Sequence, residues 1–155
     1  MSSESQTGSA SSLTPSVSDI ERSAGRYLFA VSVLSESPTE RVSTGELQEF
    51  LNVTPASVTE MVSKLDERGL VDYEKYQGVT LTDRGDALAT EVGWRFCVVS
   101  TFFESVLDTT LDEETAFDIG FLLPKNGVFR LRSQVDGACL ALCPEVDGGG
   151  EQCAP

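Results

Sequence analysis

The fold is decided by the stretch from residue 43 to residue 85, which reads STGELQEFLNVTPASVTEMVSKLDERGLVDYEKYQGVTLTDRG. It opens with a capping box, because the Ser43 hydroxyl can accept from the Glu46 amide while the Glu46 carboxylate reaches back. After a short helix and a turn, Thr54 is an N-cap with Pro55 at the first helical position, where its missing N–H costs nothing. The pattern predicts two short helices joined by a tight turn.

The residues that follow this helical pair alternate like two strands. Apolar and polar residues alternate over 70–76, Gln77-Gly78 can turn, and the alternation returns over 79–81. Thr82 then caps another helix. The turn alone would fit any helical hairpin, but a strand hairpin after it is typical of a winged helix-turn-helix. We therefore predict a mainly α fold with a small β-hairpin wing, followed by a helical dimerisation region.

The flanking segments extend this reading in both directions. Apolar residues at spacings of three and four predict a first helix over 19–35. A long helix is predicted from Thr82 to about Leu107, and another over 112–123 that stops at Pro124. The predicted organisation is a disordered Ser/Thr-rich tail, a winged helix-turn-helix domain, a helical dimerisation or sensor region and a cysteine-containing appendix, over 1–18, 19–90, 91–135 and 136–155.

Composition excludes several functions. The 155 residues contain 11 Lys plus Arg, 25 Asp plus Glu and no His, for a formal charge of −14. Without His there is no His general base, no Ser-His-Asp catalysis and no imidazole ligand. We find no phosphate loop or nucleophile elbow either, so we do not expect an enzyme. With no signal peptide and no membrane-spanning run, a cytoplasmic protein without a membrane partner is expected.

The acidity has a second meaning. Acidic residues are spread along the whole chain and only three of the basic residues are Lys. This is the surface composition of a halophilic protein, whose charge keeps it soluble in concentrated salt and says little about its partner. Four basic side chains are nevertheless expected on or beside the second helix of the pair and the wing, where phosphates would lie: Lys64, Arg68, Lys75 and Arg84.

The chain resembles the DtxR/MntR family, the metal-dependent transcriptional repressors of iron and manganese homeostasis. The resemblance covers about residues 20–124 and rests on PASVTEMVSKL at 55–65, GLV at 69–71, YEKYQGV at 73–79, LT at 81–82 and Gly85. It implies a homodimer that binds a palindromic operator in double-stranded DNA. The alternatives are a MarR-like regulator of a small ligand and a non-DNA-binding cysteine metal or redox protein on the same fold.

In that resemblance the second helix of the pair is a recognition helix that enters the major groove. Small and hydroxyl-bearing residues suit close approach, methyl contacts and hydrogen bonds to bases. The family often has Arg at the wing tip where this chain has Gln77, which weakens one phosphate contact. The predicted DNA-binding residues are Thr54, Pro55, Ala56, Ser57, Thr59, Glu60, Ser63, Lys64, Lys75 and Gln77.

The family's metal ligands do not carry over. Their positions fall on side chains that supply no anionic or imidazole group: Arg26, Phe29, Phe96, Ser100, Phe121, Pro124 and Lys125. In one interpretation, Phe29, Phe96, Phe117 and Phe121 fill the old site and Arg26 replaces the cation.

In the other interpretation, sensing has moved to the C-terminal thiols. Cys139, Cys143 and Cys153 would bind a divalent transition metal (Fe, Mn or Zn), or act as a redox switch. Cys97 is then a candidate fourth ligand, although on its own it fits a small buried side chain on a core helix. The four cysteines are expected to be free thiols or ligands in a reducing cytosol.

Overall fold

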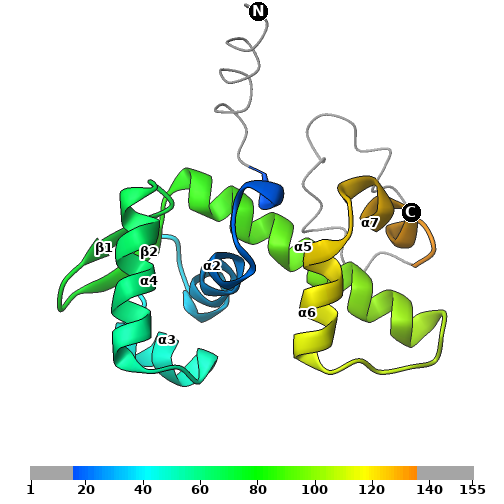
Figure 1. Ribbon diagram of the computed structural model, residues 1–155, viewed down its shortest axis with the longest axis horizontal. Helices are drawn as coiled ribbons and strands as arrows, with labels where there is room; N and C mark the ends of the chain where they lie inside the picture. Colours follow the sequence, from blue (N-terminus) through cyan, green and yellow to red (C-terminus); the bar gives the residue numbers. More distant parts are fainter. Residues whose placement is uncertain (1–15, 136–155) are drawn as a thin grey trace, which may run out of the picture.

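The computed structural model describes residues 16–135, and it confirms a mostly helical chain with an antiparallel hairpin. Figure 1 shows one long helix crossing the molecule, with the helical pair and hairpin at one end and two further helices at the other. The elements are η1 (Val17–Asp19), α2 (Arg22–Leu34), α3 (Thr44–Leu51), α4 (Pro55–Glu67), β1 (Val71–Glu74), β2 (Gly78–Leu81), α5 (Asp83–Ser105), α6 (Glu113–Leu122) and α7 (Lys125–Arg132).

The predicted caps set the helical pair. The Ser43 hydroxyl accepts from the Glu46 amide at 3.0 Å, and the Glu46 carboxylate accepts from the Ser43 amide at 3.1 Å. Asn52 ends α3 in the left-handed conformation, with φ of 56°, which Asn tolerates better than most residues. Thr54 caps α4, with Pro55 as its first residue. Local side-chain chemistry therefore fixes where both helices start and turn.

The hairpin is joined to the helices by a third short segment. Residues 71–74 pair antiparallel with residues 78–81. Val42 adds a single bridge to Val79 through two backbone hydrogen bonds of 2.8 Å. Gly85, in the first turn of α5, lies so close to the Leu70 carbonyl that a Cβ would stand 1.8 Å from its oxygen. A glycine is thus required where α5 leaves the wing.

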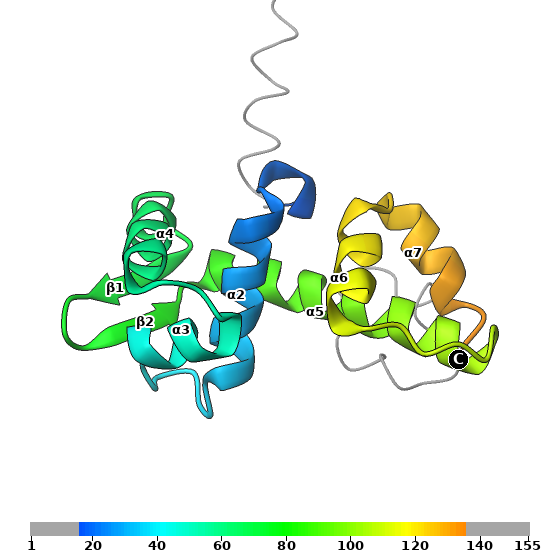
Figure 2. The same ribbon diagram turned by 60° about the horizontal axis from the view of Figure 1, so that its bottom comes forward.

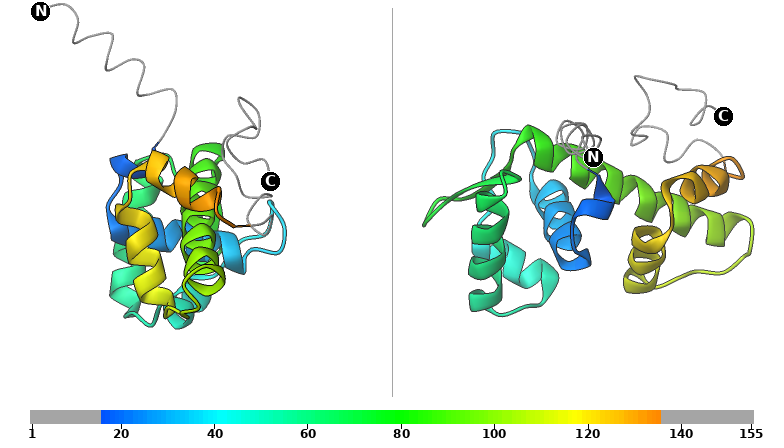
Figure 3. Two further views of the ribbon diagram at one scale, coloured as in Figure 1. Left: turned by 90° about the vertical axis from the view of Figure 1, so that its right-hand side faces the viewer. Right: turned by 45° about the horizontal axis from the view of Figure 1, so that its top comes forward.

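Two apolar cores share α5. The larger lies among α2, α3, α4, the hairpin and the first half of α5, and includes Leu28, Leu47, Leu65 and Leu88, each at most 2% exposed. The smaller one packs Trp94 and Val98 of α5 against Val128 of α7, and the Trp94 and Phe129 ring centroids are 4.7 Å apart. The right panel of Figure 3 shows α5 running from the wing to α6 and α7.

The first of the described residues differ from the prediction. Val17, which falls in the predicted disordered tail, is only 1% exposed and belongs to the larger core. Ser16 caps the single turn of η1 with a reciprocal Ser16–Asp19 box, and α2 then begins at Arg22 rather than at residue 19. A single buried Val has no periodicity to reveal it, which is why the sequence pattern missed it.

Candidate nucleic-acid interface

Helix α4 turns one side to the core and leaves the other exposed. Val58, Val62 and Leu65 are fully buried against the rest of the winged domain. The predicted contact residues lie on the opposite side, where only Ser63 is half-buried and the others are exposed: Thr54, Pro55, Ala56, Ser57, Thr59, Glu60 and Lys64. Figure 2 shows α4 and the hairpin together at one end of the molecule. The structure therefore brings the two predicted contact elements to the same end of the molecule.

Hydroxyl groups at the start of α4 are already oriented by local bonds. Thr54 Oγ1 accepts from the Ser57 amide at 3.2 Å and donates to Ser57 Oγ at 2.9 Å. Thr59 Oγ1 donates to the Pro55 carbonyl at 3.1 Å. The Ser57 hydroxyl hydrogen has no acceptor within residues 16–135, so it can donate outward to a base or a phosphate. These contacts hold Ser57 in one geometry before any ligand arrives.

Arg41 stabilises the wing by bonding both of its strands. Its guanidinium donates to the carbonyls of Asp72, at 3.1 Å, and Gly78, at 3.0 Å, and pairs with the Asp72 carboxylate at 2.9 Å. Glu74 lies 3.5 Å from the same group. One cation thus ties both strands of the hairpin together across its rear edge. The sequence analysis missed this role because nothing in the local pattern around Arg41 indicates it.

The wing tip presents an aromatic ring that the sequence analysis also missed. Tyr76 is 94% exposed and has a left-handed φ of 68°. The Lys75 ammonium lies 5.3 Å from the centre of its ring, in a cation–π contact. Lys75 and Gln77, the two predicted wing residues, flank it and are exposed. The position of Tyr76 at the turn between the two strands is the sequence signal that indicates its exposure.

The expected patch of four basic residues is smaller than predicted. Arg68 donates to Glu21 and to the Asp19 carbonyl, at 3.1 and 3.2 Å, so it faces η1 and α2. Arg84 donates to the Arg68 carbonyl at 3.3 Å on the same side. Arg68 and Arg84 do lie beside α4 and the wing, as expected, but they bond acidic and carbonyl groups of the chain itself. Lys64 and Lys75 remain on the surface formed by α4 and the wing.

Where α2 lies against α5 and α6, the side chains at the positions that the resemblance gives to the family's metal ligands do not fit a metal. Arg26 donates to Glu114 at 2.7 Å and lies 5.4 Å from the centre of the Phe117 ring. Phe29 packs against Phe96 and Phe117, with centroids 5.8 and 6.3 Å apart. Within residues 16–135 no three His, Cys, Asp or Glu side chains gather closely enough to hold a metal ion. A guanidinium and aromatic rings occupy this region instead.

A network of ion pairs joins α2 to α6 at this point. Arg22 pairs with both Glu114, at 3.2 Å, and Asp118. The hydrogen bond that Arg22 donates to the Asp118 carboxylate is the main reason that the pKa of Arg22 lies above its ordinary value. On α5, Arg95 pairs with Glu91 at 3.0 Å, and both side chains are only 7% exposed. Arg95 also donates to the carbonyls of Gly120 and Leu123, at 2.9 and 2.6 Å, so it fixes α5 to the end of α6.

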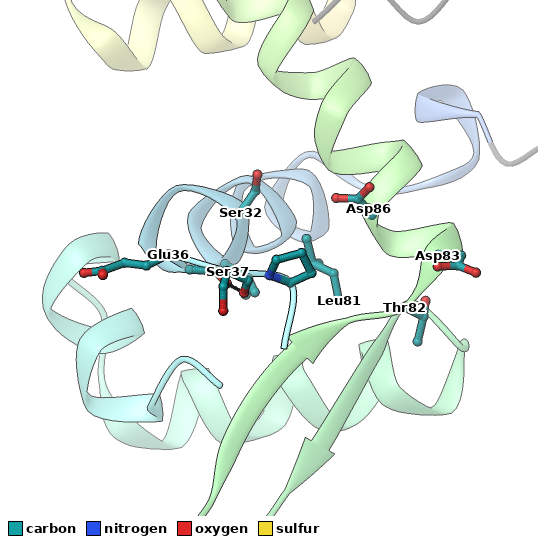
Figure 4. A pocket seen from close by; sticks show the side chains of 10 residues that line it. Ser32, Glu36, Ser37, Leu81, Thr82, Asp83 and Asp86 are labelled. Atoms are coloured by element: carbon teal, nitrogen blue, oxygen red, sulfur yellow. Dashed lines mark hydrogen bonds between the residues drawn. The ribbon is translucent and has the colours of Figure 1, made fainter. Parts of the chain in front are cut away.

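A cavity of about 380 Å³ lies between the end of α2 and the start of α5. Its wall carries the carboxylates of Glu36, Asp83 and Asp86, with Ser32 and Thr82. Figure 4 shows Glu36 pointing away from Asp83 and Asp86, so the three carboxylates do not converge on one point. The cavity is therefore neither a phosphate pocket nor a cation site.

The predicted cysteine site falls largely outside the described residues. Cys139, Cys143 and Cys153 all lie beyond residue 135. Cys97 lies half-buried on α5 and is disulfide-bonded, so the expectation of a free thiol there is wrong. A sulfur in a disulfide provides no thiolate, which excludes Cys97 as a fourth metal ligand in this state.

An exposed recognition-type helix after a tight turn, with a braced hairpin beside it, defines a winged helix-turn-helix DNA-binding protein. The model of the iron dependent repressor N-terminal DNA binding domain matches residues 19–79. An HTH-type transcriptional regulator of Methanocaldococcus jannaschii is 34% identical over 90 residues, which are 58% of this chain and 70% of that protein. The chain belongs to the DtxR/MntR family of DNA-binding transcriptional regulators, which are not enzymes.

Further relatives agree with this assignment. The regulator MntR of Oceanobacillus iheyensis is 35% identical over 106 residues, which are 68% of this chain and 64% of the relative. The manganese regulator SloR superposes with a TM-score of 0.62 at 29% identity, over 72% of this chain and 52% of SloR. A manganese-dependent repressor solved with manganese gives 0.64 at 28%, over 72% and 51%. This chain thus spans about half the length of these solved structures.

Proposed function

We propose that this protein is a transcriptional regulator that binds a palindromic operator as a homodimer and acts as a repressor in the cytoplasm. The observation that carries the proposal is the exposed side of α4, where ordered hydroxyl and methyl groups stand free beside the wing. One copy offers one such helix, and a twofold arrangement of two copies matches the symmetry of a palindrome. No helix among residues 16–135 is long and apolar enough to cross a membrane.

The contacts proposed for α4 are short and direct. Ala56 and the methyl group of Thr59 suit the thymine methyl, while Ser57 and Ser63 can bond base edges or phosphates. Glu60 can accept from the cytosine amino group. Lys64, on α4, and Lys75, in the wing, would reach phosphates on either side. Thr54, Pro55 and Gln77 complete the proposed interface at the start of α4 and at the wing tip.

Substituting Ser57 tests this proposal. Ser57→Glu places a carboxylate where the proposed DNA contact is closest, and we expect operator affinity to fall by 100-fold or more, roughly 3 kcal/mol. Mobility shifts on the protein's own promoter region in concentrated KCl would measure it. The matched control is Ser23→Glu, which makes the same change on an exposed site of α2 and should leave binding unaltered. Equal loss in both variants, or no shift by the unmodified protein, would contradict the proposal.

The salt dependence should differ from that of a basic repressor. Only two Lys lie on the proposed interface, together with the acidic Glu60, so few counterions are released on binding. We expect log affinity to fall with log salt with a slope near −2 or shallower for each copy, which the same assay measures between low and molar KCl. A slope near −6 would instead show that phosphate contacts dominate and that the interface lies elsewhere.

A divalent transition metal (Fe, Mn or Zn) at Cys139, Cys143 and Cys153 of the reduced protein is the second part of the proposal, tied to iron or manganese homeostasis. Its support is that relatives are manganese regulators by name, while the described part of the chain has no other cluster of ligands. Elemental analysis of reduced protein tests it: a stoichiometric metal that is lost on Cys143→Ala is expected. Metal that persists in this variant, or its absence in the unmodified protein, would argue for the redox alternative.

A further inference from the structure

The molecule has a second cavity, which lies between the winged domain and the C-terminal helices. It has a volume of about 260 Å³ and opens among α2, α3, α5 and α6. This is close to the lower limit of about 300 Å³ for ligand pockets, so it suits a small molecule. Its walls are mostly apolar and aromatic, from Phe29, Phe96 and Phe117 within, and Val33, Phe50 and Leu51 towards the rim.

Apolar side chains at this rim are left in water. Phe50 is 45% exposed and Val33 is 51% exposed, although both belong to helices whose other residues enter the core. The Phe29 ring contacts both Phe96 and Phe117, yet the three side chains leave space beside them rather than closing it. The predicted filling of this region by phenylalanines is therefore incomplete, and burying the remaining apolar surface would be favourable.

Two charged groups, of opposite sign, line the same cavity. The Arg26 guanidinium is held in place over the Phe117 ring. Of its five N–H groups only one is hydrogen-bonded within residues 16–135, to Glu114, so the others can take a carboxylate in bidentate fashion. Glu113 is exposed at the start of α6 and makes no ion pair within that same range. It can accept from an ammonium group.

We propose that this cavity binds an apolar α-amino acid. The ligand's carboxylate bonds Arg26, its ammonium group bonds Glu113, and its side chain enters the space beside the phenylalanine rings. A zwitterion fits better than a simple anion or cation, because either of those would leave one charged wall group facing a like charge or an apolar body. The ligand would join α2 to α6, and so connect the winged domain to the C-terminal helices.

The charge requirement can be tested with three ligands of nearly equal shape. L-leucine carries both charges, 4-methylpentanoate only the carboxylate, and 3-methylbutylamine only the ammonium group. Isothermal titration calorimetry in concentrated KCl should show binding of L-leucine, weakened about tenfold or more when either charge is removed. Glycine, which lacks the apolar body, should not bind. No binding of L-leucine or L-phenylalanine at 10 mM, or equal binding of a singly charged analogue, would overturn the proposal.

The chain supplies a matched control for each charged residue. Arg26→Gln should weaken L-leucine binding about tenfold, whereas Arg22→Gln, which removes the neighbouring α2–α6 ion pairs but does not line the cavity, should not. Glu113→Gln should weaken it similarly, whereas Asp118→Asn, which pairs with Arg22 and does not line the cavity, should not. Loss of binding in the two controls as well would show that the proposal is wrong and that only the α2–α6 contact matters. Because no DNA enters these experiments, their outcome is independent of the proposed operator binding.

Discussion

The winged domain and the C-terminal helices use charge in opposite ways. In the winged domain the cations are partly exposed and brace the surface, as Arg41 does behind the hairpin. In the C-terminal half the key ion pair, Arg95 with Glu91, is buried and its guanidinium also bonds two carbonyls at the end of α6. The winged domain thus uses an arginine to tie surface strands together, while the C-terminal half buries an arginine to hold α5 and α6 together. The surface around the hairpin should therefore tolerate the loss of its arginine better than the interior of the C-terminal half does.

The largest expected effect comes from the buried pair. Arg95→Met leaves the Glu91 carboxylate uncompensated and two carbonyls unpaired, and should lower the free energy of unfolding by about 3–5 kcal/mol. Urea denaturation followed by the fluorescence of Trp94, which is fully buried, would measure it. The double variant Glu91→Gln/Arg95→Met should recover part of the loss. If Arg95→Met lowered the unfolding free energy by less than about 1 kcal/mol, the buried ion pair would be no more important for stability than the exposed ones.

A smaller effect is expected from the brace of the wing. Arg41→Gln removes ion pairs to partly exposed carboxylates and two hydrogen bonds to backbone carbonyls, so the unfolding free energy should fall by about 1 kcal/mol. The operator affinity should fall with it, by less than in Ser57→Glu, because the wing becomes less ordered. Arg130→Gln, at an exposed position of α7, is the control, and it should change neither quantity. A decrease in the unfolding free energy equal to that of Arg95→Met would show that the winged domain does not tolerate the loss of its arginine better than the C-terminal half.

The smallest expected effect concerns the start of α6. The backbone amide of Thr115 bonds the Asp112 carboxylate at 2.9 Å, and this contact holds the pKa of Asp112 below its ordinary value of 3.8. Because the folded pKa is depressed, the stabilising effect is present above pH 3.8 and is lost as the pH falls through the lower, folded value. The Tm difference between the unmodified protein and Asp112→Asn should therefore shrink in that window. A Tm difference that does not change with pH would contradict this prediction.

Short-range chemistry made much of the fold predictable. Ser43 with Glu46, Thr54 with Pro55, and the alternation around Gly78 each act within a few residues, and the structure has both helices and the hairpin at those places. Side-chain partners across the chain were not predictable in the same way. Arg68 turns to Glu21, 47 residues away, rather than to the proposed interface. The choice depends on where α2 and η1 pack, which no local pattern reveals.

The C-terminal half shows the same limit at a candidate site. The phenylalanines at positions 29, 96 and 117 do meet, as the resemblance suggested, but the cavity beside them depends on how α3 and α6 approach α2. By residue type alone, Glu113 is an acidic residue in the first turn of a helix, where it favours the helix N-terminus. Its place on the wall of that cavity follows from the tertiary arrangement. Distances between elements, not residue types, decide which of these groups share a site.

The helix α5 belongs to both cores, and this has a consequence for how the molecule comes apart. Its 23 residues run for about 35 Å, and its first half packs with Leu88 and Val92 in the larger core while Trp94 and Val98 enter the smaller one. Helical hydrogen bonds link neighbouring turns of α5. Unfolding one core therefore also destabilises the helical turns that pack in the other core. Amide hydrogen exchange along α5 should accordingly be slowest at its middle, around Val92 to Arg95, where protection from both sides overlaps.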